Sequence, residues 1–467
     1  MTDLIYGPTF EEMLYPERVA PDLRKRAALA VEQKSLDPVN LFNITWKDPA
    51  GGVRYLLVPP ELSGVRAPIL VLLGKYFPTG SHKVGAAYSV MVEKQIQGEI
   101  TPGQDTLIFP STGNYGIGGA WVGTSMGYQS VVLLPANMSR ERFELITAYG
   151  ATYIKTPGCE SNVKEIYDKC TELEAVSSHN KILNQFEVMG NYRFHWHVTG
   201  NSALAAVTEL AKGGLTGARP AAFVSAMGSG GTIAAGDRLK QAAAACKIVG
   251  LEPMQCPTLF NNGYGNHDIQ GIGDRHVTWI HNVNNMDALM CVDDLSCKRG
   301  LQVLADPVGM SYLGKELGIS PAILAQLIGS FGISGICNLL GAIKTAKYYD
   351  FGERDVVITV ATDAIDRYHS VLNELTSVAG QLTEHEAHAR VATIFHGAGL
   401  DWIAEGTVHE RKRWHNLKYY TWVEQQGKTM ADLDAQRDPD WWLAEQAKVA
   451  ELDRAIRERR TALIAAH

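Results

Sequence analysis

Short apolar runs alternate with segments of helical length along this chain, and this alternation is the feature that most constrains its fold. Apolar or β-branched residues dominate positions 106–109, 130–134 and 151–154, and a glycine-rich segment and a charged segment separate them. Strands that alternate with helices form βαβ units, in which the strands are parallel and the helices cover the sheet. The same pattern returns at residues 222–226, 247–251 and 356–360.

The repetition predicts an α/β fold with two three-layer αβα domains, each built on a parallel-rich sheet, and a helical C-terminal extension. We place the two domains at residues 1–200 and 201–375, and the extension at 376–467. The extension carries five of the nine tryptophans, and residues 445–464 are typical of one amphipathic helix. It either packs on the core or forms an oligomer interface.

The charge and the cysteines restrict the class of protein further. The 43 basic and 50 acidic residues give a net charge of −7, so the chain lacks the basic footprint of a nucleic-acid-binding protein. Its seven cysteines form no CxxC pair, and its first residues do not resemble a secretory signal. We therefore expect reduced thiols in a cytoplasmic protein. His195 and His197 lack nearby acidic ligands, so we expect no metal site.

One uncharged segment is long enough to cross a membrane. No charged residue lies between Gly318 and Ile343. Glycine and serine residues interrupt the segment at 329–335, and such a cluster breaks a helix. The segment therefore predicts two buried helices joined by a turn, and no contact with a membrane.

Lys83 is the first residue with a chemical role. It follows the sequence Pro-Thr-Gly-Ser-His at 78–82 and begins a predicted helix. The positive end of a helix disfavours an ammonium group, and desolvation lowers the pKa of a lysine further. A lysine in this position is a usable amine nucleophile or base.

Two loops that follow predicted strands are suited to anions. The sequence Ser-Thr-Gly-Asn-Tyr-Gly at 111–116 offers hydroxyl and backbone N–H groups to a carboxylate. The sequence Gly-Ser-Gly-Gly-Thr at 228–232 lets the backbone approach an anion at a helix start. It matches neither GxGxxG nor the Walker pattern, so a single phosphate monoester fits it better than a dinucleotide or a triphosphate.

Thr362 and Asp363 follow the predicted strand at 356–360, at the carboxyl end where ligands of parallel sheets bind. An amine nucleophile, a carboxylate loop, a phosphate loop and a polar strand end on one scaffold indicate pyridoxal phosphate as the cofactor. Lysine forms the covalent link, the glycines hold the phosphate, and a polar group tunes the ring.

These motifs resemble those of the fold type II pyridoxal-phosphate enzymes, which include cysteine synthase, cystathionine β-synthase, threonine synthase and the tryptophan synthase β chain. Residues 78–83 resemble the lysine motif of tryptophan synthase β-like proteins, and 111–116 resemble the asparagine loop of the cysteine synthases. The glycine loop at 228–232, the Gln185-Phe186 pair and a glycine turn at 332–335 also match. The resemblance spans roughly residues 70–370.

The resemblance implies a role for each matching residue. Lys83 would hold the cofactor and shuttle a proton, and Asn114 would bind the 3′ oxygen of the ring. The residues implied to bind the phosphate are Gly228, Ser229, Gly230, Gly231 and Thr232. The residues implied to surround the substrate and its carboxylate are Ser111, Thr112, Gly113, Asn114, Tyr115 and Gln185.

The sequence departs from the family pattern at two points. The loop at 111–116 lacks the glutamate with which tryptophan synthase β activates indole, which argues against indole chemistry. Ala364 stands where cysteine synthases place the serine that faces the pyridine nitrogen. Thr362 would keep that nitrogen neutral and Asp363 would protonate it; we favour Thr362 and leave both open.

The resemblance implies a homodimeric enzyme acting on a β-substituted L-alanine of the serine, O-activated serine or cysteine type, through an aminoacrylate. We favour β-replacement, as in cysteine synthase. The alternatives are an ammonia-lyase or dehydratase, β-elimination of serine, threonine or cysteine, and a threonine synthase-like reaction. A pyridoxal-phosphate-binding module without turnover is the alternative from another class.

Overall fold

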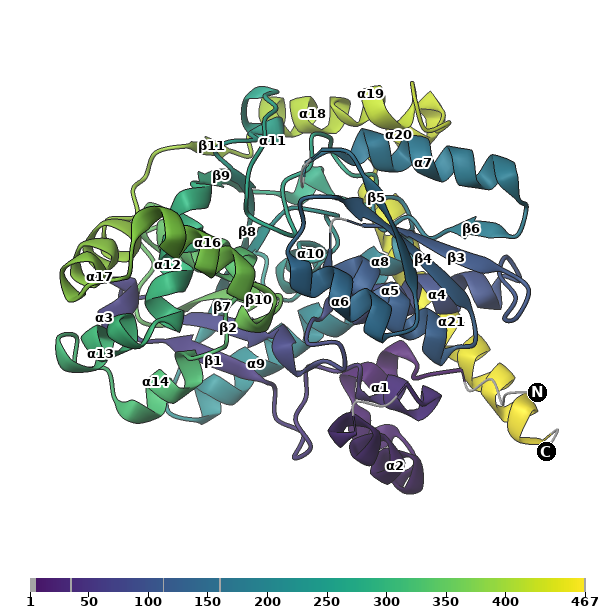
Figure 1. Ribbon diagram of the computed structural model, residues 1–467, viewed down its shortest axis with the longest axis horizontal. Coiled ribbons are helices and arrows are strands. Elements are labelled where there is room, and N and C mark those ends of the chain that lie inside the picture. Colours follow the sequence, from purple (N-terminus) through teal and green to yellow (C-terminus); the bar gives the residue numbers. More distant parts are fainter. Residues whose placement is uncertain (1–5, 34–35, 112, 159–160, 466–467) are drawn as a thin grey trace.

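The computed structural model describes residues 6–33, 36–111, 113–158 and 161–465, which form two β-sheets and the helices that cover them (Figure 1). The larger sheet has the order β1-β2-β10-β7-β8-β9-β11. Its five inner strands are parallel, and β1 and β11 pair antiparallel at its edges. In chain order its strands are Tyr55–Val58, Ile69–Leu73, Arg219–Ala226, Lys247–Pro253, Ala288–Val292, Asp355–Ala361 and Ile403–Glu405.

The smaller sheet is entirely parallel and has the order β5-β4-β3-β6. In chain order its strands are Thr106–Pro110, Gln129–Pro135, Thr152–Thr156 and Asn180–Ile182. The predicted strands at 106–109, 130–134 and 151–154 are therefore present, and the α/β class is confirmed. The α-helices between residues 83 and 194 are α4 (Lys83–Ile96), α5 (Asn114–Ser125), α6 (Arg140–Ala148), α7 (Val163–Val176) and α8 (Met189–Phe194).

Strand β2 shows how the larger sheet is covered on both faces. Ile69 and Val71 point into one hydrophobic core, and Leu70 and Leu72 point into another. This alternation follows from the pleat of a strand. Because all five residues of β2 are buried, helices must cover both faces, as in other parallel sheets. The other α-helices that end before residue 316 are Phe10–Leu14 (α1), Pro21–Glu32 (α2), Pro60–Ser63 (α3), Gly200–Lys212 (α9), Ala234–Ala242 (α10), Thr258–Asn261 (α11), Asp294–Ala305 (α12) and Pro307–Lys315 (α13).

The two sheets do not follow the order of the chain. Strands β1 and β2 lie in the segment predicted as the first domain, but they pair in the larger sheet with strands of the second. Strand β10 lies between β2 and β7, and its pairing with β2 brings residues 69–73 beside residues 357–361. The domain ranges 1–200 and 201–375 stay predictions, and the first of them contributes strands to both sheets.

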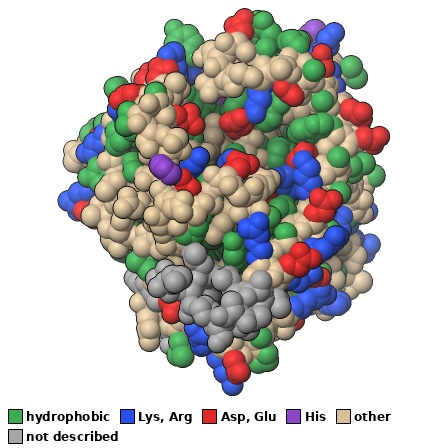
Figure 2. Space-filling view, turned by 90° about the vertical axis from the view of Figure 1, so that its right-hand side faces the viewer, with side chains coloured by type: hydrophobic (Ala, Val, Ile, Leu, Met, Phe, Trp, Pro, Cys, Tyr) green, Lys and Arg blue, Asp and Glu red, His purple; other side chains and the backbone are tan. Residues whose placement is uncertain are grey.

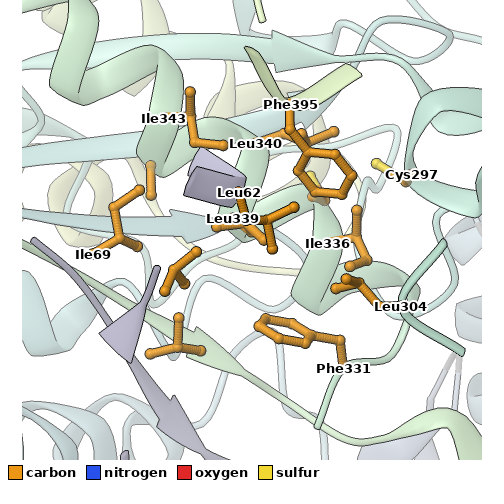
Figure 3. Close-up of a cluster of buried hydrophobic side chains, with 14 of the residues drawn as sticks. Leu62, Ile69, Cys297, Leu304, Phe331, Ile336, Leu339, Leu340, Ile343 and Phe395 are labelled. Carbon is orange, nitrogen blue, oxygen red and sulfur yellow. The ribbon is translucent and has the colours of Figure 1, made fainter. Parts of the chain in front are cut away.

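The uncharged segment at 318–343 folds as the predicted helix, turn and helix. Helix α14 (Pro321–Leu327) is followed by a turn and by α15 (Ile333–Tyr348), which packs on the larger sheet. Figure 3 shows this core, with α15 side chains facing Leu62, Phe331 and Phe395. Within the described residues, no helix is both long enough and apolar enough to span a membrane.

The extension is helical, as predicted, except for β11, which adds an antiparallel edge to the larger sheet. Its long last helix, α21, contains the predicted helix at 445–464 and lies against α4 and α8 (Figure 1). Acidic and basic side chains are interspersed on the face in Figure 2. The helices after β10 are His369–Ala379 (α16), Glu384–Arg390 (α17), Val408–Asn416 (α18), Lys418–Trp422 (α19), Met430–Ala435 (α20) and Pro439–Ala465 (α21).

Candidate active site

The sheet topology brings the sequence motifs together. Strands β2, β10 and β7 are parallel neighbours, so the segments that follow them emerge at one edge of the larger sheet. These segments carry Lys83, Thr362 and the glycine loop at 228–232. They enclose a narrow cavity lined by Lys83, Ser225, Ala226, Gly228, Ser229, Gly230, Thr232, Gly271, Ile272, Asn338 and Thr362.

Lys83 is the first residue of α4, as predicted, and its side chain lies in this cavity. The residue is only 9% exposed, and its Nζ donates a hydrogen bond of 3.0 Å to Ser229 Oγ. Burial lowers the pKa of Lys83 to about 8, and the negative charge of Asp274 partly opposes this shift. A substantial fraction of this amine is therefore neutral near pH 8, which is the form that attacks an aldehyde or accepts a proton.

Asp274 is a site residue that sequence reasoning missed. Burial raises the pKa of its carboxyl to about 7, and the charge of Lys83 opposes that shift. Its Oδ2 is buried and has no hydrogen-bond partner among the described residues. It follows Gly271 and Ile272 of the cavity wall in a segment without regular structure, so no strand or helix pattern identified it.

The glycine loop forms a cup at the start of α10. Gly230 has a φ of +74°, and a Cβ there would lie 2.5 Å from Thr278 Oγ1. A Cβ on Gly231 would lie 2.2 Å from Asn191 Oδ1, so both positions exclude a side chain. The hydroxyl of Thr278 is buried without a hydrogen-bond partner in the described part of the chain. A backbone cradle, a helix N-terminus and an unused hydroxyl donor fit a phosphate ester.

Thr232, the last residue of the cup, is held by the histidine that precedes Lys83. His82 Nε2 lies 3.2 Å from Thr232 Oγ1. The His82 ring packs on the rings of His195 and Trp46, with centroids 5.1 and 5.4 Å away. Burial, with the nearby charge of Lys83, holds the pKa of His82 well below its ordinary value. The imidazole is therefore neutral and positions Thr232 without adding a charge.

The asparagine loop closes on itself through Ser111. Ser111 Oγ accepts hydrogen bonds from the N–H groups of Gly113 and Gly116, each at 2.9 Å. The Tyr115 hydroxyl donates to Leu183 O at 3.0 Å, so this side chain points into the core and leaves only its backbone for a ligand. Gln185 Nε2 donates to Pro110 O at 3.3 Å, which places it beside the end of β3. Thr112 lies outside the described residues.

Asn114 joins this loop to the segment after β10. Its Nδ2 donates to Asp363 Oδ2 at 2.6 Å, and the Tyr368 hydroxyl donates to the same oxygen at 2.7 Å. The Arg367 guanidinium donates to Asn114 Oδ1 and to the carbonyl of Thr79. Asp363 Oδ2 is thus engaged by Asn114 and Tyr368, and its Oδ1 is buried without a hydrogen-bond partner among the described residues. Thr362, by contrast, lines the cavity beside Lys83.

Two buried arginines in this region were also missed. Arg142 Nη2 donates to the Tyr368 hydroxyl at 3.1 Å, and its Nε would lie 2.8 Å from a Cβ on Gly113. Arg142 and Arg367 are both fully buried. Their sequence signal is weak, since a single arginine in a charged helix or after a strand is ordinarily exposed. Together they place positive charge beside the asparagine loop at 111–116.

Comparisons with known proteins agree with this site. A family model described as pyridoxal-phosphate dependent enzyme matches residues 55–305. A cysteine synthase of Staphylococcus aureus is 32% identical over 322 residues, covering 68% of this chain and 93% of that protein. Cystathionine beta-synthase of Saccharomyces cerevisiae is 29% identical over 345 residues, covering 72% of this chain and 63% of that protein. The crystal structure of a cysteine synthase from Entamoeba histolytica has a TM-score of 0.59 at 21% identity, covering 74% of this chain and 93% of that one.

The fold and the comparisons define the class as a pyridoxal-phosphate enzyme of fold type II. This chain belongs to the pyridoxal-phosphate dependent enzyme family, and its cofactor is pyridoxal phosphate. The predicted class, fold and cofactor are confirmed, whereas the roles of individual residues stay proposals.

We predict that Gly230→Ala weakens pyridoxal-phosphate binding, because the new methyl group meets Thr278 Oγ1 and deforms the cup. Loss of one charge-assisted hydrogen bond corresponds to roughly tenfold to a hundredfold in affinity. Visible absorbance during cofactor titration measures the change. Gly98→Ala is the matched control, because Gly98 has a similar φ of +77° and no atom within 4 Å of its would-be Cβ. Equal affinity in both variants would exclude the cup as the binding site.

We predict that the rate of cofactor attachment to the cofactor-free protein rises with pH through a midpoint near the Lys83 pKa of about 8. Asp274→Asn removes the negative charge that raises this pKa, so its midpoint lies lower. Asp268→Asn is the control, because Asp268 is on the same segment and pairs with Lys298 instead. Stopped-flow absorbance gives the midpoints. A wild-type midpoint at the ordinary lysine value, or an upward shift in Asp274→Asn, contradicts this prediction.

Proposed function

We propose that the enzyme catalyses β-replacement on a β-substituted L-alanine of the serine, O-activated serine or cysteine type. The observation that carries the proposal is the buried Lys83 amine, with a pKa of about 8, in a cavity that it shares with the glycine loop at 228–232 and Thr362. The cysteine synthases and cystathionine beta-synthase among its relatives support the same reaction class. β-Elimination and ammonia-lyase chemistry, or a threonine synthase-like reaction, are the outcomes against which it is tested.

The asparagine loop binds the substrate carboxylate in this proposal. Gly113 precedes α5 and residues 114–116 form its first turn, whose N–H groups favour a negative charge. Arg142 lies against Gly113 and adds a buried positive charge beside the loop. Gln185 stands at the end of β3 and completes the pocket. An amino-acid substrate whose carboxylate is held here is oriented with its amino group toward Lys83.

Lys83 performs the proton transfer. When bound, pyridoxal phosphate supplies an electron sink that stabilises negative charge at Cα of the attached amino acid. The neutral Lys83 amine, once released from the cofactor, is the general base that removes the Cα proton. Ser229 holds Nζ at 3.0 Å, and the Asp274 carboxylate stabilises the ammonium form that results. Lys83 then returns the proton or delivers it to the leaving group.

Thr362 is proposed to face the pyridine nitrogen of the cofactor. It lines the cavity with Lys83, and Asp363 is engaged by Asn114 and Tyr368 instead. A hydroxyl leaves the nitrogen unprotonated and makes a weaker electron sink than a carboxylate does. A weaker electron sink stabilises the negative charge at Cα less. It therefore favours reactions in which the departure of a β-substituent removes that charge.

A cytoplasmic homodimer is part of the proposal. The six cysteines that the structure describes are buried free thiols, which fits a reducing compartment. Size-exclusion chromatography with light scattering measures the oligomeric state.

We predict that the holoenzyme converts a β-substituted alanine and a thiol, amine or carbon nucleophile into a substituted amino acid. Lys83→Ala loses activity on the order of a thousandfold or more, because Lys83 supplies the amine among the residues that line the cavity. Lys94→Ala is the control, because Lys94 lies on the same helix and pairs with Glu99 at the surface. Product mass and keto-acid assays follow the reaction.

Three outcomes contradict this function. Keto acid formed at the same rate with and without a nucleophile assigns the enzyme to the lyases. A cofactor spectrum that no amino acid changes identifies a binding module without turnover. Ordinary turnover in Lys83→Ala removes Lys83 from the mechanism.

A further inference from the structure

Residues 277–281 form one wall of the glycine cup, through Thr278 and His281. A Cβ on Gly230 would lie 2.5 Å from Thr278 Oγ1 and 2.8 Å from His281 Cβ. Trp279 N donates to Phe186 O at 2.9 Å, which ties this wall to the segment that carries Gln185. The position of these residues therefore determines the shape of the cup.

The C-terminal extension holds the other side of the same wall. Trp422 Nε1 donates to Val277 O at 2.8 Å. Lys418 Nζ donates to Trp279 O at 2.9 Å and to His281 O at 2.7 Å. Both donors belong to α19, which lies outside the residues that the family model matches. A helix of the extension thus binds three carbonyl groups of the cup wall.

The Lys418 amine lies in a site that offers it only neutral hydrogen-bond acceptors, together with the rings of Trp279 and Trp442, whose centroids are 5.8 and 5.7 Å from Nζ. The residue is fully buried, and its third acceptor is Gln436 Oε1 at 2.6 Å. In the described part of the chain no carboxylate forms an ion pair with it. Burial holds the pKa of Lys418 well below its ordinary value. Three acceptors take up all three N–H groups of an ammonium, which is the form that burial disfavours. A negative charge nearby would raise the pKa of Lys418 and stabilise these contacts.

We propose that Lys418 is a positioning residue for the cofactor phosphate, whose charge it complements from behind the cup wall. The proposal rests on the placement of the phosphate in the glycine loop at 228–232, as proposed above. A phosphate dianion there is separated from Lys418 by residues 278–281 and is attracted to its ammonium group through protein rather than water. Attraction through this medium is stronger than in solvent. The extension is therefore part of the cofactor site.

The test compares two vitamers that differ only in the phosphate. Pyridoxal and pyridoxal 5′-phosphate form the same bond to a lysine, so the ratio of their dissociation constants isolates the contribution of the phosphate. Lys418→Gln removes the charge and keeps donors for the carbonyl groups, and Lys418→Met removes both. We expect either variant to lower the preference for the phosphorylated vitamer on the order of tenfold.

Trp422→Phe is the matched control. It removes one neutral hydrogen bond to the same wall, at Val277 O, and leaves the charge in place. A structural role of α19 predicts that all three variants change the preference alike. The proposal predicts that Trp422→Phe retains it. An unchanged preference in both Lys418 variants, or an equal loss in Trp422→Phe, overturns the proposal.

Thr232→Val separates this proposal from the one on which it rests. If the phosphate lies in the cup, loss of the Thr232 hydroxyl lowers the preference for the phosphorylated vitamer. If it does not, the placement of the phosphate is wrong, and the role of Lys418 is overturned with it. A loss in Thr232→Val without a loss in the Lys418 variants overturns only the role of Lys418.

A measurement on the wild-type protein covers the case in which the Lys418 variants do not fold. At roughly pH 9 the phosphate is already a dianion, since its second pKa is about 6. The titratable groups that interact with Lys418 are His281 and His415, and His415 also faces Arg437 and Asp434. The two histidines have pKa values of about 3 and about 4, so they stay neutral.

Calorimetry in buffers of different ionisation enthalpy counts the protons that each vitamer brings to the cofactor-free protein. We expect greater proton uptake with pyridoxal 5′-phosphate than with pyridoxal, because only the phosphate draws a proton to Lys418. Equal uptake overturns the proposal.

Discussion

The removal of the Lys83 amine from water is the interaction on which the rest of this structure depends. A buried ammonium group is costly, so burial favours the neutral form that reacts. Ser229 and Asp274 limit this effect, because one accepts a hydrogen bond from Nζ and the other supplies a negative charge. The result is an amine with a pKa of about 8, poised between the two forms that a proton shuttle needs.

The sheet order explains why this amine meets its partners. Lys83, the glycine cup and Thr362 follow β2, β7 and β10, respectively. These three strands are parallel neighbours in the larger sheet, although they are distant from one another in the chain. The asparagine loop reaches the same place from the smaller sheet, through the contact of Asn114 with Asp363. The site therefore spans both sheets, and it requires the pairing of β2 with β10 across almost 300 residues of sequence.

The sequence predicted the parts of this site that are local. Lys83 at a helix start, the loop at 111–116 and the cup at 228–232 are visible because strand, turn and helix follow one another directly. Asp274, Thr278 and Lys418 were not predicted, because they lie in an irregular segment or a short helix and owe their roles to distant neighbours. The assignment of β2 to the larger sheet was missed for the same reason, since long-range pairing leaves no local pattern. The contact of the Tyr115 hydroxyl with Leu183 O in the core was likewise not predicted from its motif.

Borohydride reduction of the holoenzyme, followed by peptide mapping, tests the central claim most directly. Reduction makes the link between lysine and cofactor permanent, so the modified peptide identifies the lysine. A single pyridoxyl-modified peptide that contains Lys83 is expected. A label on another lysine, or a protein that takes up no cofactor, would contradict it.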